Sequence, residues 1–211
     1  MINRVRPAPW TLVLAAWVLA SCGPAGIVIG TGAVVARSVI QERSTQDALT
    51  DTEIQLTLNN KFLEHSTGLF GDVSTSVVEG RVVLTGSVPE RSDKVTATEL
   101  SWQTAGVVEV TDELTVQQDS GAVAYAEDAW ISNQLRVKLL ADGKVSSVNY
   151  SVETVDKVVH LTGLARSKSE LARVIDHASG LDGVAKVVSH VLTIDDPRRQ
   201  VTSASDVRTT G

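Results

Sequence analysis

The sequence predicts an α+β fold made of two tandem αββαβ modules, each a small three-stranded mixed sheet with two helices packed on one face. The first observation is an internal duplication, because the chain aligns with itself without a gap at a shift of 77 residues. The second is that apolar residues recur at the helical period and at the strand period in the same order in both copies. The third is a helix between the second and third strands, which predicts a crossover and therefore a mixed sheet.

The duplication sets the domain boundaries. Residues 51–116 form the first module, residues 117–127 a linker and residues 128–194 the second module. Each module is short, so its core is small and packing against the other module or a partner would help to stabilise it. The aligned pairs cover helix, strand and turn positions: Ile54 with Ile131, Leu58 with Leu135, Leu63 with Leu140, Val82 with Val159, and Leu84-Thr85-Gly86 with Leu161-Thr162-Gly163.

Short polar motifs predict where the helices begin. Thr50-Asp51-Thr52-Glu53 has the capping-box pattern, and Asp128 is expected to be the N-cap of the corresponding helix in the second module. Ser167-Lys168-Ser169-Glu170 is a further capping box, which predicts the start of the second helix of that module.

Alternation of apolar residues predicts the strands. The first strand of each module is expected to contain these residues: Val73, Thr75 and Val77, or Val148, Tyr150 and Val152. Hairpin turns are expected at Glu79-Gly80 and Asp156-Lys157, and the third strands at residues 107–116 and 184–194. Gly86 and Gly163 are expected to end the second strands, where the backbone needs a positive φ or a tight turn, and not to bind a ligand.

The first 21 residues have the features of a lipoprotein signal peptide. Arg4 and Arg6 precede a short apolar stretch, Trp10 to Leu19, which is too short to span a bilayer comfortably. The tetrapeptide Leu19-Ala20-Ser21-Cys22 resembles the lipobox of bacterial lipoproteins, which implies cleavage before Cys22 and acylation of that residue. A buried or free thiol is the alternative interpretation of this single cysteine.

The lipobox and the composition of the chain predict what the segments on either side of the two modules are. Residues 22–50 are expected to be the lipidated N-terminus and a tether, and residues 195–211 a polar, disordered tail. Gly23 stands after the cysteine where aspartate would favour retention in the inner membrane. By resemblance to the enterobacterial sorting rule, this residue favours the outer membrane, with the protein facing the periplasm.

The segment Asp128–Asp142 predicts a helix with two apolar faces. Ile131, Leu135 and Leu139 recur every four residues and are expected to face the core. The side chains on roughly the opposite face are Trp130, Val137 and Leu140. The first copy has Glu53 and Asn60 where the second has Trp130 and Val137, so the fold does not require the second apolar face. This face either packs against the other module or contacts lipid.

Charge distinguishes the two modules. Residues 51–116 carry 4 basic and 11 acidic residues, a net charge of −7, whereas residues 128–194 carry 8 and 7, a net charge of +1. An anionic leaflet should repel the first module and tolerate the second, where Arg136 and Lys138 are candidates for phosphate contacts. The whole chain has a net charge of −6 and no strongly basic block, which argues against nucleic acid as a partner.

The sequence does not predict catalysis, a metal site or a cofactor. Four histidines, at positions 65, 160, 177 and 190, are scattered along the chain without a paired metal-ligand spacing. No nucleophile-elbow, Walker or dinucleotide-binding motif is present. We therefore expect a binding protein and not an enzyme.

The segment Val77-Val78-Glu79-Gly80-Arg81-Val82-Val83-Leu84-Thr85-Gly86, within the αββαβ order, resembles the BON domain. The second copy keeps Leu161 and Gly163 but has Lys157 in place of Gly80, which weakens the turn signal. A lipobox followed by two such domains is similar to the dual-BON outer-membrane lipoproteins associated with division sites and outer-membrane stress.

That resemblance implies an envelope function. In the dual-BON lipoproteins the helix corresponding to Asp128–Asp142 binds anionic phospholipid, so Trp130, Val137, Leu140, Arg136 and Lys138 are the expected lipid-binding residues. The expected role is support of envelope integrity. The alternative is a scaffold that docks an envelope partner, such as the outer-membrane assembly machinery, through the acidic first module or the Trp130 face.

Overall fold

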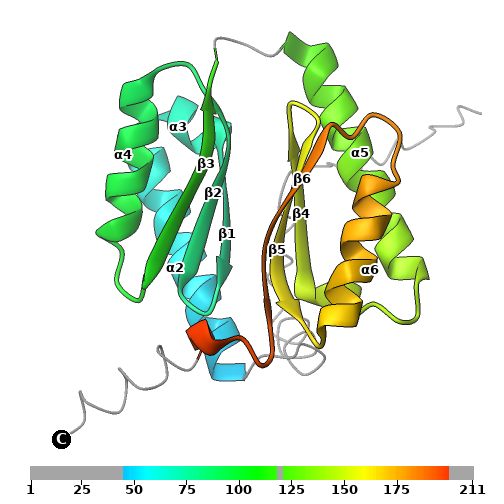
Figure 1. Ribbon diagram of the computed structural model, residues 1–211. Helices are drawn as coiled ribbons and strands as arrows, with labels where there is room; N and C mark the ends of the chain where they lie inside the picture. Colours follow the sequence, from blue (N-terminus) through cyan, green and yellow to red (C-terminus); the bar gives the residue numbers. More distant parts are fainter. Residues whose placement is uncertain (1–44, 118–120, 200–211) are drawn as a thin grey trace, which may run out of the picture.

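The computed structural model describes residues 45–117 and 121–199, and Figure 1 shows that they form two modules of similar architecture. The expectations for the signal peptide, for Cys22 and for the tether as far as residue 44 lie outside the described residues. So do those for residues 200–211 of the tail. Within the described ranges, the helices are all too short or too polar to cross a bilayer.

The first module contains three helices and a three-stranded sheet. Its elements are α2 (Thr45–His65), α3 (Thr67–Asp72), β1 (Val73–Val78), β2 (Arg81–Val88), α4 (Arg91–Trp102) and β3 (Glu109–Val116). The short helix α3 was not predicted. Ser66 caps it, because the Ser66 hydroxyl accepts a 2.9 Å hydrogen bond from the Leu69 N–H.

The second module repeats this order with a 3₁₀ turn in place of α3. Its elements are α5 (Gly121–Ala141), the turn Ser147–Asn149, β4 (Tyr150–Val155), β5 (Val158–Ala165), α6 (Lys168–Ser179) and β6 (Lys186–Thr193). Val148 lies in the 3₁₀ turn, so its prediction as a strand residue is wrong. Ser167 caps α6 as predicted, accepting a 3.2 Å hydrogen bond from the Glu170 N–H.

Both sheets have the predicted mixed topology. In the first, β1 pairs antiparallel with β2, and β2 pairs parallel with β3. In the second, β4 and β5 are antiparallel, and β5 and β6 are parallel. The predicted core residues of the first helix in each module are buried against these sheets: Ile54, Leu58, Ile131, Leu135 and Leu139. The α+β fold of two tandem αββαβ modules is therefore confirmed.

The capping box Thr50-Asp51-Thr52-Glu53 does not open its helix and Asp128 does not cap its own, so both predictions are wrong. Helix α2 begins six residues before Asp51 and α5 seven residues before Asp128. The Asp51 carboxylate instead accepts hydrogen bonds of 2.8 Å from the backbone N–H groups of Glu79 and Gly80, at the hairpin turn. The hairpin turns at Glu79-Gly80 and Asp156-Lys157 lie at the predicted positions. Their residues have the left-handed backbone conformation that tight hairpins require.

Gly86 and Gly163 lie inside their strands and do not end them. Each has a positive φ, as predicted, of 129° and 147°. A Cβ atom at either position would lie 2.0 Å from a backbone carbonyl oxygen, that of Asp72 or Asn149. Close approach of the preceding segment therefore explains both glycines without a bound ligand.

The two modules dock through the faces of their sheets that the helices leave uncovered. Figure 1 shows the resulting order of layers, with the two sheets in the middle and the helices outside. Strand β1 contacts β5, and β2 contacts β4. Four apolar side chains are buried here outside the two helix-covered cores: Val78, Val83, Leu164 and Leu192. Sheet docking therefore leaves the outer faces of the helices exposed.

The segment after β6 joins the second module to the first. The Arg199 guanidinium lies 2.6 Å from the Glu79 carboxylate, and Arg81 donates a 2.6 Å hydrogen bond to the Arg198 carbonyl. Residues 195–199 were predicted to begin a disordered tail, but they form these ordered contacts with the first module.

Candidate functional site

Helix α5 carries a row of exposed apolar side chains along its outer surface. Val123, Trp130 and Val137 lie seven residues apart, so they fall close to one line along the helix. Their exposed fractions are 74%, 66% and 66%, and that of neighbouring Leu140 is 74%. We call these four residues the α5 apolar face. Several large apolar side chains exposed on one side of a helix make that side a candidate interaction surface.

The core contacts of α5 fix the orientation of this face. Ile131, Leu135 and Leu139 are buried in the second module, and the Ser132 hydroxyl donates a 2.8 Å hydrogen bond to Thr154 on β4. Trp130 lies on the other side of the helix. Because the modules dock through their sheets, the alternative that Trp130 packs against the first module is wrong.

The corresponding outer surface of α2 in the first module carries both polar and apolar side chains. Glu53 and Asn60, which align with Trp130 and Val137, are exposed on α2. Leu63, which aligns with Leu140, is exposed as well. The aligned core positions Ile54 and Ile131, and Leu58 and Leu135, are buried in both helices, whereas the outer surfaces of the helices differ.

Val123 is a site residue that the sequence interpretation missed. It was assigned to the linker 117–127, but α5 begins at Gly121. Tyr125, also exposed, was missed for the same reason. Extending the seven-residue spacing from Val137 and Trp130 one step toward the N-terminus would have identified Val123.

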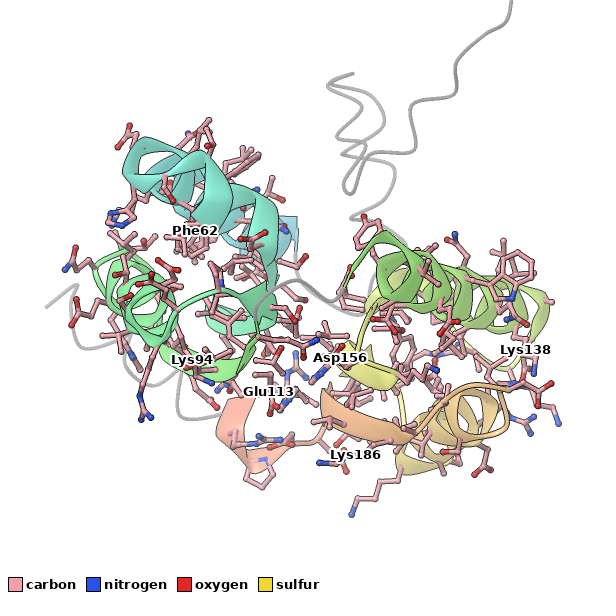
Figure 2. All side chains as sticks on the ribbon, turned by 90° about the horizontal axis from the view of Figure 1, so that it is seen from above. Phe62, Lys94, Glu113, Lys138, Asp156 and Lys186 are labelled. Atoms are coloured by element: carbon pink, nitrogen blue, oxygen red, sulfur yellow. The ribbon has the colours of Figure 1, made fainter. Side chains whose placement is uncertain are left out.

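The two predicted phosphate-binding residues differ in their surroundings. The Arg136 guanidinium donates to the Val152 carbonyl and lies 3.3 Å from the Glu153 carboxylate, so its charge is partly compensated within the module. Burial raises the pKa of Glu153, and the nearby Arg136 partly offsets that effect. Lys138 is exposed, and Figure 2 shows it toward the outer end of α5. Lys138 is therefore better placed than Arg136 to contact a phosphate group outside the protein.

Further basic residues surround the C-terminal end of α5. A shallow pocket beside it is lined by Lys144, Arg166, Ser167, Ser169, Glu170 and Arg173. Asp142 fixes this end of the helix, because it lies 2.8 Å from His177 Nε2 and 3.3 Å from Arg173. The hydrogen bond with His177, the Lys144 N–H and Arg173 lower the pKa of Asp142 to about 2.

A second cluster of polar side chains lies where the modules meet. His190 Nε2 lies 3.1 Å from the Glu113 carboxylate of the first module, and His160 is buried close to both. Burial, with the nearby His190 and Lys186, lowers the pKa of His160 against the opposing effect of Glu113. The parallel pairing of β5 with β6 and the docking of the two sheets bring together residues that are scattered along the sequence.

Known proteins resemble this chain over most of its length. The "uncharacterized protein in gshII 5′ region" of Anaplasma centrale is 37% identical over 142 residues, which is 67% of this chain and 93% of that protein. The outer membrane lipoprotein DolP of Haemophilus influenzae is 32% identical over 167 residues, 79% of this chain and 86% of that protein. The osmotically-inducible protein Y of Escherichia coli is 29% identical, over 68% and 72% of the two chains.

A solved structure of CdsD, a structural protein of the type III secretion system of Chlamydia trachomatis, also resembles the chain. Its C-terminal domain is 15% identical, covering 64% of this chain and 63% of that one, with a TM-score of 0.28. A likeness at that score supports no conclusion about fold or function.

The family comparison matches both modules. Residues 50–118 and residues 127–194 each match the BON domain, and these ranges contain the two observed three-stranded sheets. The chain therefore belongs to the BON domain family and carries one BON domain in each module.

Proposed function

We propose that this chain is an outer-membrane lipoprotein that faces the periplasm and binds anionic phospholipid through helix α5 of its second BON domain. Its role is support of envelope integrity. The α5 apolar face carries the proposal, since Trp130, Val137 and Leu140 are each about two-thirds exposed or more. The similarity to DolP, an outer membrane lipoprotein by name, supports the place in the envelope.

The chemistry of α5 matches an interfacial helix. Tryptophan prefers the headgroup level because its ring is apolar and its N–H is polar, and the neighbouring aliphatic side chains can enter the acyl region. Lys138 and Lys144 lie on or just beyond this helix, and each basic residue near an anionic surface contributes about 1 kcal/mol. The second module has a net charge of +1 and the first a net charge of −7, so an anionic membrane surface favours contact with the second.

The lipid anchor and α5 can act on the same leaflet. Acylated Cys22 lies 23 residues before the start of α2, a length of chain that can span at most roughly 80 Å. The anchor supplies most of the affinity, since several acyl chains hold a protein stably. Helix α5 then sets which lipids lie against the second domain.

Co-sedimentation of residues 23–211 with phosphatidylglycerol vesicles tests the proposal without the acyl chains. We expect binding to these vesicles, weaker binding to phosphatidylcholine vesicles, and a loss of roughly tenfold or more in the Trp130→Glu variant. The matched control is Trp102→Glu, because Trp102 is an exposed tryptophan, 53% exposed, on the first domain. Unchanged binding by folded Trp130→Glu protein would refute the assignment of α5.

A second function is favoured by the first domain. Phe70 on α3 and Trp102 on α4 are both exposed in a domain with a net charge of −7. Exposed aromatic side chains are typical of protein interfaces, so this domain is a candidate surface for an envelope protein such as a member of the outer-membrane assembly machinery. Photocrosslinking from position 102 of the full chain, with position 130 as the comparison, distinguishes a protein partner of the first domain from lipid contact by the second.

A further inference from the structure

The docked sheets bring two histidines and a glutamate together. One ring nitrogen from each of His160 and His190 and one carboxylate oxygen of Glu113 all lie within 4.8 Å of one another. Bonds of about 2.0–2.2 Å to a tetrahedral ion place its ligand atoms roughly 3.3–3.6 Å apart. The observed cluster is therefore close to the size that one metal ion requires.

The three residues come from three strands in two domains. His160 is on β5 and His190 on the neighbouring parallel strand β6, where it pairs with Thr162. Because alternate residues of a strand share a face, His160 and His190 are diagonal neighbours on the side of the sheet that faces the first domain. Glu113 comes from β3 of that domain, and Figure 2 shows it at the junction between the two. The cluster exists only because the domains dock.

The histidine nitrogens lack the hydrogen bonds that buried polar atoms normally make. His160 is 5% exposed, and its Nδ1 atom is buried with no hydrogen-bond partner among residues 45–117 and 121–199. His190 Nε2 is buried close to Glu113, but the described residues give it no hydrogen bond of acceptable geometry. A buried polar atom without a partner is costly, and a bound ion is one of the few ways to satisfy it.

The ligand set selects the class of ion. Two imidazole nitrogens and one carboxylate oxygen suit Zn²⁺ and neighbouring transition metals, whereas Ca²⁺ and Mg²⁺ prefer oxygen ligands alone. Three protein ligands leave one position of a tetrahedral ion for water. We infer that Glu113, His160 and His190 form a binding site for one Zn²⁺ or similar transition-metal ion, which joins the two BON domains across their docked sheets.

Zinc binding to the detergent-solubilised full chain, stripped of metal by a chelator, tests this inference by calorimetry. We expect about one Zn²⁺ per chain, and Glu113→Gln and His190→Gln should each weaken the affinity by roughly tenfold or more. The controls replace similar residues outside the cluster. Glu109→Gln removes another carboxylate of β3, and His65→Gln removes an exposed histidine of α2. Both controls should bind as the parent protein does.

A measurement on the unmodified protein keeps the test independent of variant folding. The ring resonances of His160 and His190 should shift on addition of one equivalent of Zn²⁺, while those of His65 should not. The midpoint of thermal unfolding should also rise with Zn²⁺, because the ion binds only the docked state. Absence of stoichiometric binding to the parent protein, or equal binding by folded Glu113→Gln and His190→Gln variants, would overturn the inference.

Discussion

The backbone N–H of Lys157 donates a 2.9 Å hydrogen bond to the carboxylate of Asp128, although 29 residues separate the two along the chain. The N–H of Asp156 donates to the same carboxylate at 2.7 Å. Asp51 makes the same pair of contacts with the turn of the first domain. In each domain a buried helix carboxylate thus fixes the hairpin turn beside it.

The Asp128→Ala substitution should destabilise the second domain by about 2–3 kcal/mol, since it leaves two partly buried N–H groups without an acceptor. Urea denaturation followed by circular dichroism measures this change. The exposed Asp182 provides the control, because Asp182→Ala should change stability by no more than about 0.5 kcal/mol. Equal stability of the two variants would contradict the role of Asp128.

The Lys157→Gly substitution should stabilise the protein by up to about 1 kcal/mol. Lys157 has a φ of 64°, which costs free energy for a residue with a Cβ atom, and the first domain has glycine at this position. The ion pair with Glu127 that the substitution removes is half exposed and contributes little. Lys157→Ala removes the same ion pair but keeps the Cβ atom, so it should not stabilise. Thermal unfolding of both variants separates the two effects.

The Gly163→Ala substitution should cost roughly 3 kcal/mol or more. The added Cβ atom would lie 2.0 Å from the Asn149 carbonyl oxygen, at a φ of 147°, so the backbone of the turn Ser147–Asn149 or of β5 must move. Gly143→Ala is the control, because a Cβ atom there has no neighbour within 4 Å. Chemical denaturation should show a large loss in the first variant and almost none in the second.

The sequence predicted the cores and topology well because those depend on local periodicity. Ile131, Leu135 and Leu139 could be assigned from spacing alone, and the duplication supported Ile131 and Leu135 through their counterparts Ile54 and Leu58. The start predicted for the first helix of each module was wrong for a physical reason. An aspartate before an apolar run has the same appearance whether it caps its own helix or a turn 28 residues away, as Asp128 does.

The candidate sites were predictable to different degrees. Trp130 and Val137 were identified because the first domain has polar residues at the same positions of an otherwise matching helix. The cluster of Glu113, His160 and His190 could not be identified, because it depends on which faces of the two sheets dock. Neither helical spacing nor strand alternation carries that information.

Stability should fall as the pH drops from about 4 to about 2, partly through Asp142. Its pKa is lowered from 3.8 to about 2 by the hydrogen bond with His177, the Lys144 N–H and Arg173. A lowered pKa in the folded state means that the ionised carboxylate stabilises the fold above pH 4, and protonation removes that contribution as the pH falls. Asp142→Asn should be less stable at neutral pH and show a flatter dependence in this range. Urea denaturation at a series of pH values measures both, and parallel curves for the two proteins would contradict the assignment.

Tryptophan fluorescence should report membrane contact from one domain only. Residues 23–211 contain only two tryptophans, Trp102 and Trp130. In the Trp102→Phe variant all emission comes from Trp130, and transfer of its ring from water to the headgroup region should shift the emission to shorter wavelength on phosphatidylglycerol vesicles. In the Trp130→Phe variant the emission comes from Trp102 of the acidic domain and should stay constant. A shift in the second variant instead of the first would assign the membrane contact to the first BON domain.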